Sequence, residues 1–149
     1  AFWFAKRLHQ QEKFDAIWAM MAHACGVPAG KFKKAFPEVP YLLTLQEGDP
    51  LPYIEHKMRF FGKAFDEGFT RADVVQSIST FLAGWAKQKG FAGKAVHIPN
   101  AVNTAHFTAP IAPEALATAR EALGKKPDDV LLVTTSRLVK KNAVDDVIS

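Results

Sequence analysis

Short apolar segments alternate with helix-like segments along most of this 149-residue chain. Strands that are apolar on both faces are typical of a parallel sheet with helices packed on both sides. The alternation therefore predicts an α/β fold built on a doubly wound parallel sheet. The predicted strands are Asp15–Met21, Tyr41–Gln46, Asp73–Ile78, Ala95–Ile98 and Val130–Thr135.

The longest helical pattern lies in Pro52–Gly68. Its apolar residues Ile54, Met58, Phe61 and Phe65 recur at spacings of four, three and four. Such spacing places the four side chains on one face of a single helix. We expect this face to pack on the sheet.

Capping residues indicate three more helices. Ser79 is an expected N-cap, and Gly90 is placed to end the helix that follows. Pro113 opens the next helix, and Asn142 is predicted to cap the last one. In the helix from Pro113, one face is expected to hold Leu116, Ala119 and Leu123. In the last helix, the residues expected to face inward are Val144, Val147 and Ile148.

Composition narrows the class of protein. The chain is 48% hydrophobic, enough for a core, which argues against disorder. Its one cysteine, Cys25, excludes an intramolecular disulfide and fits a reducing compartment. No apolar run approaches the roughly 20 residues that span a bilayer. We therefore expect a cytoplasmic protein, and leave open a position at the inner face of the membrane.

The five histidines do not form a metal-binding pattern, and no glycine-rich nucleotide loop is present. We therefore expect neither a metal nor a cofactor. The net charge of +4 is modest and no recognition motif is present, so nucleic acid is not an expected partner.

Two motifs carry a family resemblance. The segment VHIPNAVNTAHF at 96–107 reads as a strand ending in a Pro-Asn turn, and VLLVTTSRLVKKNAVDD at 130–146 as a strand ending in a basic turn and a helix start. Together they resemble the domain junction of family-four glycosyltransferases of the GT-B architecture. In that family I-P-N-G-V-D-x-x-x-F leaves the first domain and G-R-L-x-x-x-K-G opens the second. Ser136 and Ala143 stand where the family commonly has glycine.

The resemblance implies a domain organisation. Residues 1–107 would be the later part of an N-terminal, acceptor-side, Rossmann-like domain. Residues 108–126 would be a connector and its helix, beginning with the proline-rich stretch Thr108–Pro113. Residues 127–149 would start a C-terminal domain that binds the nucleotide sugar. We expect the chain to be the central fragment of such an enzyme and to be inactive alone.

The basic turn is the first candidate site. Arg137 offers a planar fork for two phosphate oxygens, and a lysine offers a compact charge. A helix N-terminus after the turn would add partial positive charge. Lys141 is the preferred phosphate lysine and Lys140 the alternative. By resemblance, the donor is a UDP- or GDP-sugar and the acceptor a sugar or a lipid-linked hydroxyl.

The carboxyl ends of the predicted strands supply the second candidate site. Gln46, Glu47 and Asp49 follow one strand and could bind sugar hydroxyls, and Glu47 or Asp49 could take a proton. The alternative is that these residues only form a turn and bind no ligand. Ser79 and Asn100 follow two other strands. An N-cap explains Ser79 and a local turn explains Asn100 without any ligand.

Two other functions stay open. A noncatalytic α/β module could use the basic turn to bind anionic lipid or protein, and a GT-B sugar-nucleotide epimerase would share the architecture. The helical segment from Pro52 to Phe69 could also lie on an anionic membrane through its phenylalanines and cations. The alternative is that the aromatic residues face the sheet. The residues of this membrane hypothesis are Phe60, Phe61, Phe65, Lys57, Arg59 and Lys63.

Overall fold

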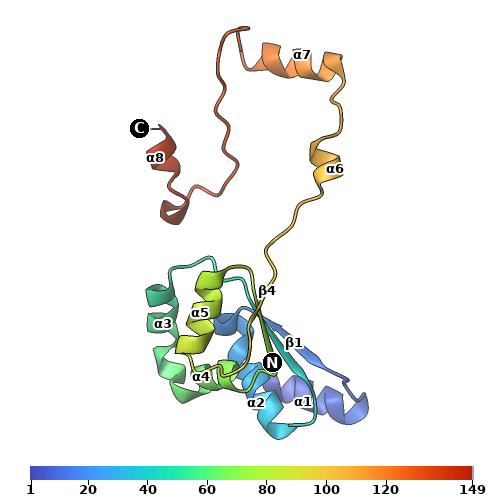
Figure 1. Cartoon of the computed structure of the whole chain (residues 1–149), viewed down its shortest axis with the longest axis vertical. Helices are drawn as coiled ribbons and strands as arrows, with labels where there is room; N and C mark the ends of the chain where they lie inside the picture. Colours follow the sequence, from blue (N-terminus) through green and yellow to red (C-terminus); the bar gives the residue numbers. More distant parts are fainter. Residues whose placement is uncertain (149) are drawn as a thin grey trace. The chain divides into compact units, whose positions relative to one another are not determined.

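The computed structural model describes residues 1–148 (Figure 1). The chain divides into two compact units, one from Ala1 to Asn100 and one from Ala101 onward. Unit 1 contains the only sheet of the described residues, and unit 2 is a series of short helices and extended segments. The domain boundary expected at Thr108–Pro113 stays a prediction.

Unit 1 is an α/β domain built on a four-stranded parallel sheet. The strands β1 (Ile17–Met20), β2 (Tyr41–Leu45), β3 (Val74–Ser77) and β4 (Val96–His97) lie in the order β1-β2-β3-β4. Each falls inside a predicted strand, so four of the five strand predictions are confirmed. The predicted α/β class with a parallel sheet is confirmed as well.

The helices of unit 1 connect these strands. Two predicted features are confirmed: the Ser79 side chain caps α5, and Gly90, at a φ of 89°, follows its end. Two of the helices below, at Phe2–Gln11 and Val27–Ala35, were not predicted from the sequence. The helices are α1 (Phe2–Gln11), a π-helical turn η1 (Ala22–Gly26), α2 (Val27–Ala35), α3 (Leu51–Met58), a 3-10 turn η2 (Arg59–Phe61), α4 (Lys63–Thr70) and α5 (Thr80–Gln88).

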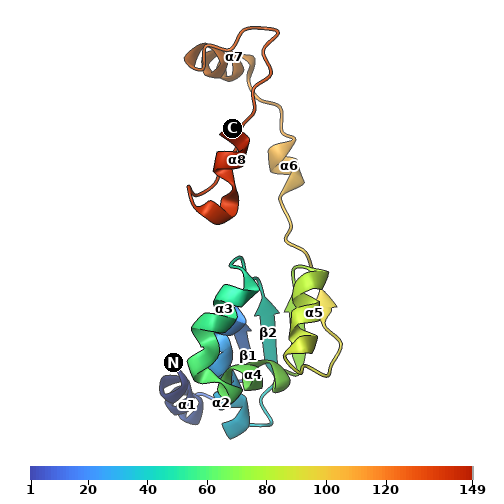
Figure 2. The ribbon, with the colours of Figure 1, turned by 90° about the vertical axis from the view of Figure 1, so that its left-hand side faces the viewer.

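One face of the sheet carries the core. Alternate strand residues such as Leu43, Leu45 and Val75 point into it and are completely buried. Trp85 of α5 is only 2% exposed, and its ring lies edge-on to Phe69 with 4.9 Å between centroids. Figure 2 shows α3, α4 and α5 on the same side of the sheet.

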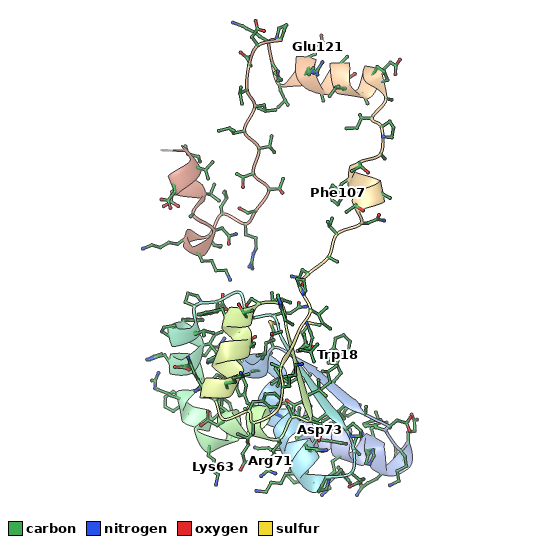
Figure 3. The ribbon with its side chains drawn as sticks, viewed as in Figure 1. Trp18, Lys63, Arg71, Asp73, Phe107 and Glu121 are labelled. Carbon is green, nitrogen blue, oxygen red and sulfur yellow. The ribbon has the colours of Figure 1, made fainter. Side chains whose placement is uncertain are left out.

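The opposite face is open within the described residues. Trp18 is 67% exposed, and Met20, Val74 and Val96 are exposed on the same face (Figure 3 labels Trp18). Right-handed crossovers between strands added in one direction all lie on one side of a sheet. The strand order has no reversal among residues 1–148, so these crossovers cover one face only.

The single helix predicted over Pro52–Gly68 is wrong. Gly62, at φ 43° and ψ −125°, separates α3 and η2 from α4. This conformation lies outside any helix and favours glycine, because a side chain there meets the backbone. Ile54, Met58 and Phe65 are buried as predicted, whereas Phe61 is 51% exposed.

Unit 2 contains α6 (Thr104–Phe107), α7 (Pro113–Ala122), a 3-10 turn η3 (Lys140–Asn142) and α8 (Val144–Ile148). The strand predicted at Val130–Thr135 is wrong, since this segment has no regular structure. A strand needs a neighbour for its hydrogen bonds. No strand lies in the described part of unit 2, so the apolar run has nothing to pair with there.

The predicted opening of α7 at Pro113 is confirmed. The cap predicted at Asn142 is wrong, because α8 begins at Val144 and the residue directly before it is Ala143. The Asn142 amide N–H donates instead to the carbonyl of Arg137, at 2.9 Å. Neither α7 nor α8 has a buried residue among those described, so their predicted inward faces are wrong for unit 2 by itself.

No helix in residues 1–148 has both the length and the apolar character that a membrane span requires.

Candidate functional site

The carboxyl ends of β1, β2 and β3 form the polar edge of the sheet. In a parallel sheet all strands end on this edge, which is where α/β proteins bind ligands. β1 leads into Met21 and η1, β2 into Gln46 and Glu47, and β3 into Ser79. Chain segments distant in sequence therefore meet here because of the parallel register.

Glu47 is the central side chain of this edge. Its carboxylate is buried, and Oε1 accepts a 2.6 Å hydrogen bond from the backbone N–H of Ala22. His23 Nδ1 lies 3.7 Å from the same oxygen. Glu47 thus connects the end of β2 to the first turn after β1. The Glu47 carboxylate is therefore enclosed by the fold.

The turn after β1 has an unusual backbone. Met21 has φ 63° and ψ 116°, and its N–H still donates to the carbonyl of Thr44 at 2.8 Å. A positive φ in a residue other than glycine costs about 1–3 kcal/mol and persists only where its surroundings hold it. The bonds from Met21 to Thr44 and from Ala22 to Glu47 are two such restraints. They point the start of η1 at the Glu47 carboxylate.

Burial raises the pKa of the Glu47 carboxyl group, and the Ala22 N–H and His23 partly oppose this shift. A raised pKa means that the folded protein binds this proton more tightly than the unfolded chain. The contribution of Glu47 to stability is therefore complete below its ordinary pKa of 4.5 and declines as the pH rises through the folded value.

We expect Glu47→Gln to remove this decline. The amide oxygen can still accept from Ala22, but the residue no longer titrates. Urea unfolding of both proteins, at pH values from below 4.5 to neutral, should show the wild type losing stability relative to the variant as the pH rises.

Glu55→Gln is the matched control, because the pKa of Glu55 is lowered, first by its hydrogen bond from Trp85 and then by Lys89. The contribution of Glu55 to stability is present above the ordinary pKa of its carboxyl group and is lost as the pH falls. Its pH dependence therefore has the opposite sign to that of Glu47. A pH-independent difference between wild type and Glu47→Gln would contradict the assignment.

Three buried polar atoms on this edge lack a hydrogen-bond partner among the described residues. They are Glu47 Oε2, His23 Nδ1 and the Ser77 hydroxyl at the end of β3. Buried polar atoms are normally paired with protein or with ordered water, so each of the three can accept such a partner. Neither His23 nor Ser77 was among the site residues predicted from the sequence. The signal for His23 was its place just after a predicted strand, the same place that selected Glu47.

The other predicted edge residues occupy different environments. Gln46 and Asp49 are half-buried in the segment between β2 and α3. The Ser79 hydroxyl accepts from the Leu82 N–H at 3.2 Å, so its N-cap role is confirmed. Asn100 is exposed at the last position of unit 1. The edge therefore brings Gln46, Glu47 and Asp49 to one strand end and Ser79 to the next.

The basic turn lies in unit 2. Arg137 and Lys140 are exposed, and Lys141 is exposed in η3. The turn is closed by the Asn142 amide on the carbonyl of Arg137. Ala143 then adopts the left-handed conformation, with φ 49° and ψ 37°, before α8 begins.

Cavities and metal ligands do not indicate another site. One cavity of about 680 Å³ is lined by residues between Ala83 and Ala95, and one of about 370 Å³ lies beside α1 and Cys25. Neither is lined by Glu47 or His23. No group of three potential metal ligands occurs in the described part of the chain.

Comparison with known proteins does not assign this chain to a family. No model of a protein family matches the chain, and no curated protein matches it.

Proposed function

We propose that this chain is the central part of a GT-B glycosyltransferase that moves a sugar from a nucleotide-sugar donor to an acceptor hydroxyl. The observation that carries the proposal is the position of the Pro-Asn motif. It leaves β4 at the carboxyl edge of the sheet, the edge that also holds the unpaired polar atoms of Glu47, His23 and Ser77. A hydroxyl-rich ligand that displaced water from this edge would supply donors and acceptors to these atoms.

The topology supports the same proposal. A doubly wound sheet consists of two halves, and in each half strands are added in one direction with helices on one face. Unit 1 has the order and the one-sided helices of such a half. The open face with Trp18 is where the helices of the other half would pack.

The backbone of the basic turn is a further support. Ala143 stands where the resembling motif commonly has glycine, and it adopts a left-handed conformation that glycine favours. In other residues this conformation costs about 1 kcal/mol. In the ungapped alignment, which places Asn142 at the lysine of the motif, the glycine position therefore coincides with a left-handed residue of this chain.

In the proposed reaction the bond between the anomeric carbon and the diphosphate oxygen breaks, and the diphosphate leaves with the electron pair. The acceptor oxygen forms the new bond to the anomeric carbon, and its proton passes to an oxygen of the departing diphosphate. Arg137 and Lys141 would stabilise the charge that grows on the diphosphate, which makes a metal ion unnecessary. Gln46, Glu47, Asp49, Ser79 and Asn100 are the proposed contacts to donor sugar and acceptor.

Calorimetric titration with UDP and with GDP, using the protein that carries this chain, tests the proposal. Arg137→Ala combined with Lys141→Ala should weaken binding of the preferred nucleotide at least about tenfold, because two charge-assisted hydrogen bonds are lost. Lys125→Ala with Lys126→Ala removes the same charge from the same unit and should leave binding unchanged. Absence of binding, or equal losses in the two double variants, would refute the donor site.

An epimerase of the same architecture is separated from a transferase by its products. Incubation with a radiolabelled nucleotide sugar should give label on the acceptor only when an acceptor is present. If the labelled nucleotide sugar is instead converted to a different nucleotide sugar when no acceptor is present, the protein is an epimerase and the transferase proposal is refuted.

A further inference from the structure

The break between α3 and α4 produces an exposed aromatic pair. Phe60 is 82% exposed and Phe61 is 51% exposed. Gly62 turns the chain sharply after them, and a side-chain carbon placed on Gly62 would meet no described atom within 4 Å apart from those of its own chain neighbours. Within the described residues the turn therefore has open space around Gly62. Two adjacent, largely exposed phenylalanines carry a solvation cost that a soluble surface does not require.

Cations surround this pair. Lys57, Arg59 and Lys63 are all exposed, and the Arg59 guanidinium lies 4.3 Å from the centre of the Phe60 ring. None of the three makes an ion pair with a carboxylate in the described part of the chain. Arg59 instead contacts the His56 ring and the His56 carbonyl.

The nearby carboxylates are already paired elsewhere. Glu55 and Asp66 both contact Lys89 of the α5 end, at 3.2 Å and 3.5 Å. Glu67 lies 3.4 Å from Arg71, which is on the same helix. The turn around Phe60 and Phe61 therefore presents a basic surface around an apolar tip.

We propose that this turn, Lys57–Lys63, is a peripheral membrane-binding site that inserts Phe60 and Phe61 into an anionic lipid surface. Exposed aromatic side chains partition into the boundary between headgroups and acyl chains, and the lysines and arginine bind the lipid phosphates. Phe65, which the sequence analysis grouped with these residues, is buried in the core and takes no part. The site does not depend on the proposed transferase activity.

Co-sedimentation with lipid vesicles tests the proposal. The full chain should bind vesicles of equal parts phosphatidylcholine and phosphatidylglycerol, and bind phosphatidylcholine vesicles much more weakly. Phe60→Ala combined with Phe61→Ala should lower the partition coefficient at least about tenfold. Lys57→Gln with Lys63→Gln should lower binding to the anionic vesicles about fivefold or more, since each cation near such a surface contributes about that factor.

Phe81→Ala combined with Phe107→Ala is the matched control. Both rings are exposed and lie outside the segment Lys57–Lys63, so a similar apolar area is removed at other positions and binding should be retained. All substituted side chains are exposed, so folding should be unaffected, as circular dichroism can verify. Failure of the wild type to bind anionic vesicles, or equal losses in the two aromatic double variants, would overturn the proposal.

Discussion

Trp85→Ala is expected to lower the free energy of unfolding of unit 1 by about 3–5 kcal/mol, the range for removing a buried large aromatic side chain. Trp85 packs against Phe65 and Phe69, at centroid distances of 6.2 Å and 4.9 Å. Its indole N–H also donates to Glu55 at 3.1 Å. Truncation would leave a cavity between α5 and α4, and the Glu55 carboxylate would lose the hydrogen bond from the indole N–H.

Urea unfolding followed by far-ultraviolet circular dichroism measures this loss, because that signal does not depend on tryptophan emission. Phe81→Ala is the control on the same helix. Phe81 is exposed, so its loss should change the free energy by less than about 0.5 kcal/mol. A Trp85→Ala loss near that of the control would mean that α5 does not pack on the sheet as described.

Gly68→Ala is expected to lower the free energy of unfolding by about 1–3 kcal/mol, as overpacking does. A side-chain carbon on Gly68 would lie 2.9 Å from the carbonyl carbon and oxygen of Gly26. Gly30 makes the reciprocal approach, 2.9 Å from the Glu67 carbonyl oxygen. Backbone faces backbone between α4 and the η1–α2 segment, so no flexible side chain can yield.

The sign of the effect distinguishes this packing from helix propensity. Alanine is a better helix former than glycine, so Gly84→Ala in the middle of α5, where the new carbon meets no atom within 4 Å, should stabilise by about 0.5–1 kcal/mol. Opposite signs for two identical substitutions, measured by the same unfolding experiment, are the expected result. Stabilisation by both would show that α4 and η1 are not in contact.

The sequence predicted the parts of the fold that depend on local pattern. Four strands were found because each is a short apolar run, and Ser79 and Gly90 were assigned from capping chemistry. The strand expected at Val130–Thr135 failed because a strand also depends on a neighbour, which apolar character alone does not supply. Gly62 was overlooked because the spacing of Ile54, Met58 and Phe65 is compatible with an unbroken helix.

The candidate site was predictable only in part. Glu47 was found from its place after a buried strand. Its contact with Ala22 joins segments 25 positions apart and follows from the register of β1 against β2, which periodicity does not reveal. The same holds for His23, whose relation to Glu47 appears only when the two strand ends lie side by side.

The placement of the strands also bears on how unit 1 opens. β2 and β3 each pair with a neighbour on both sides, whereas β1 has only β2 and β4 has only β3. Breaking an outer strand therefore releases one ladder, while breaking an inner strand releases two. Partial unfolding should start at the outer strands and reach β2 and β3 last, so the turn that Glu47 holds will loosen from the β1 side first.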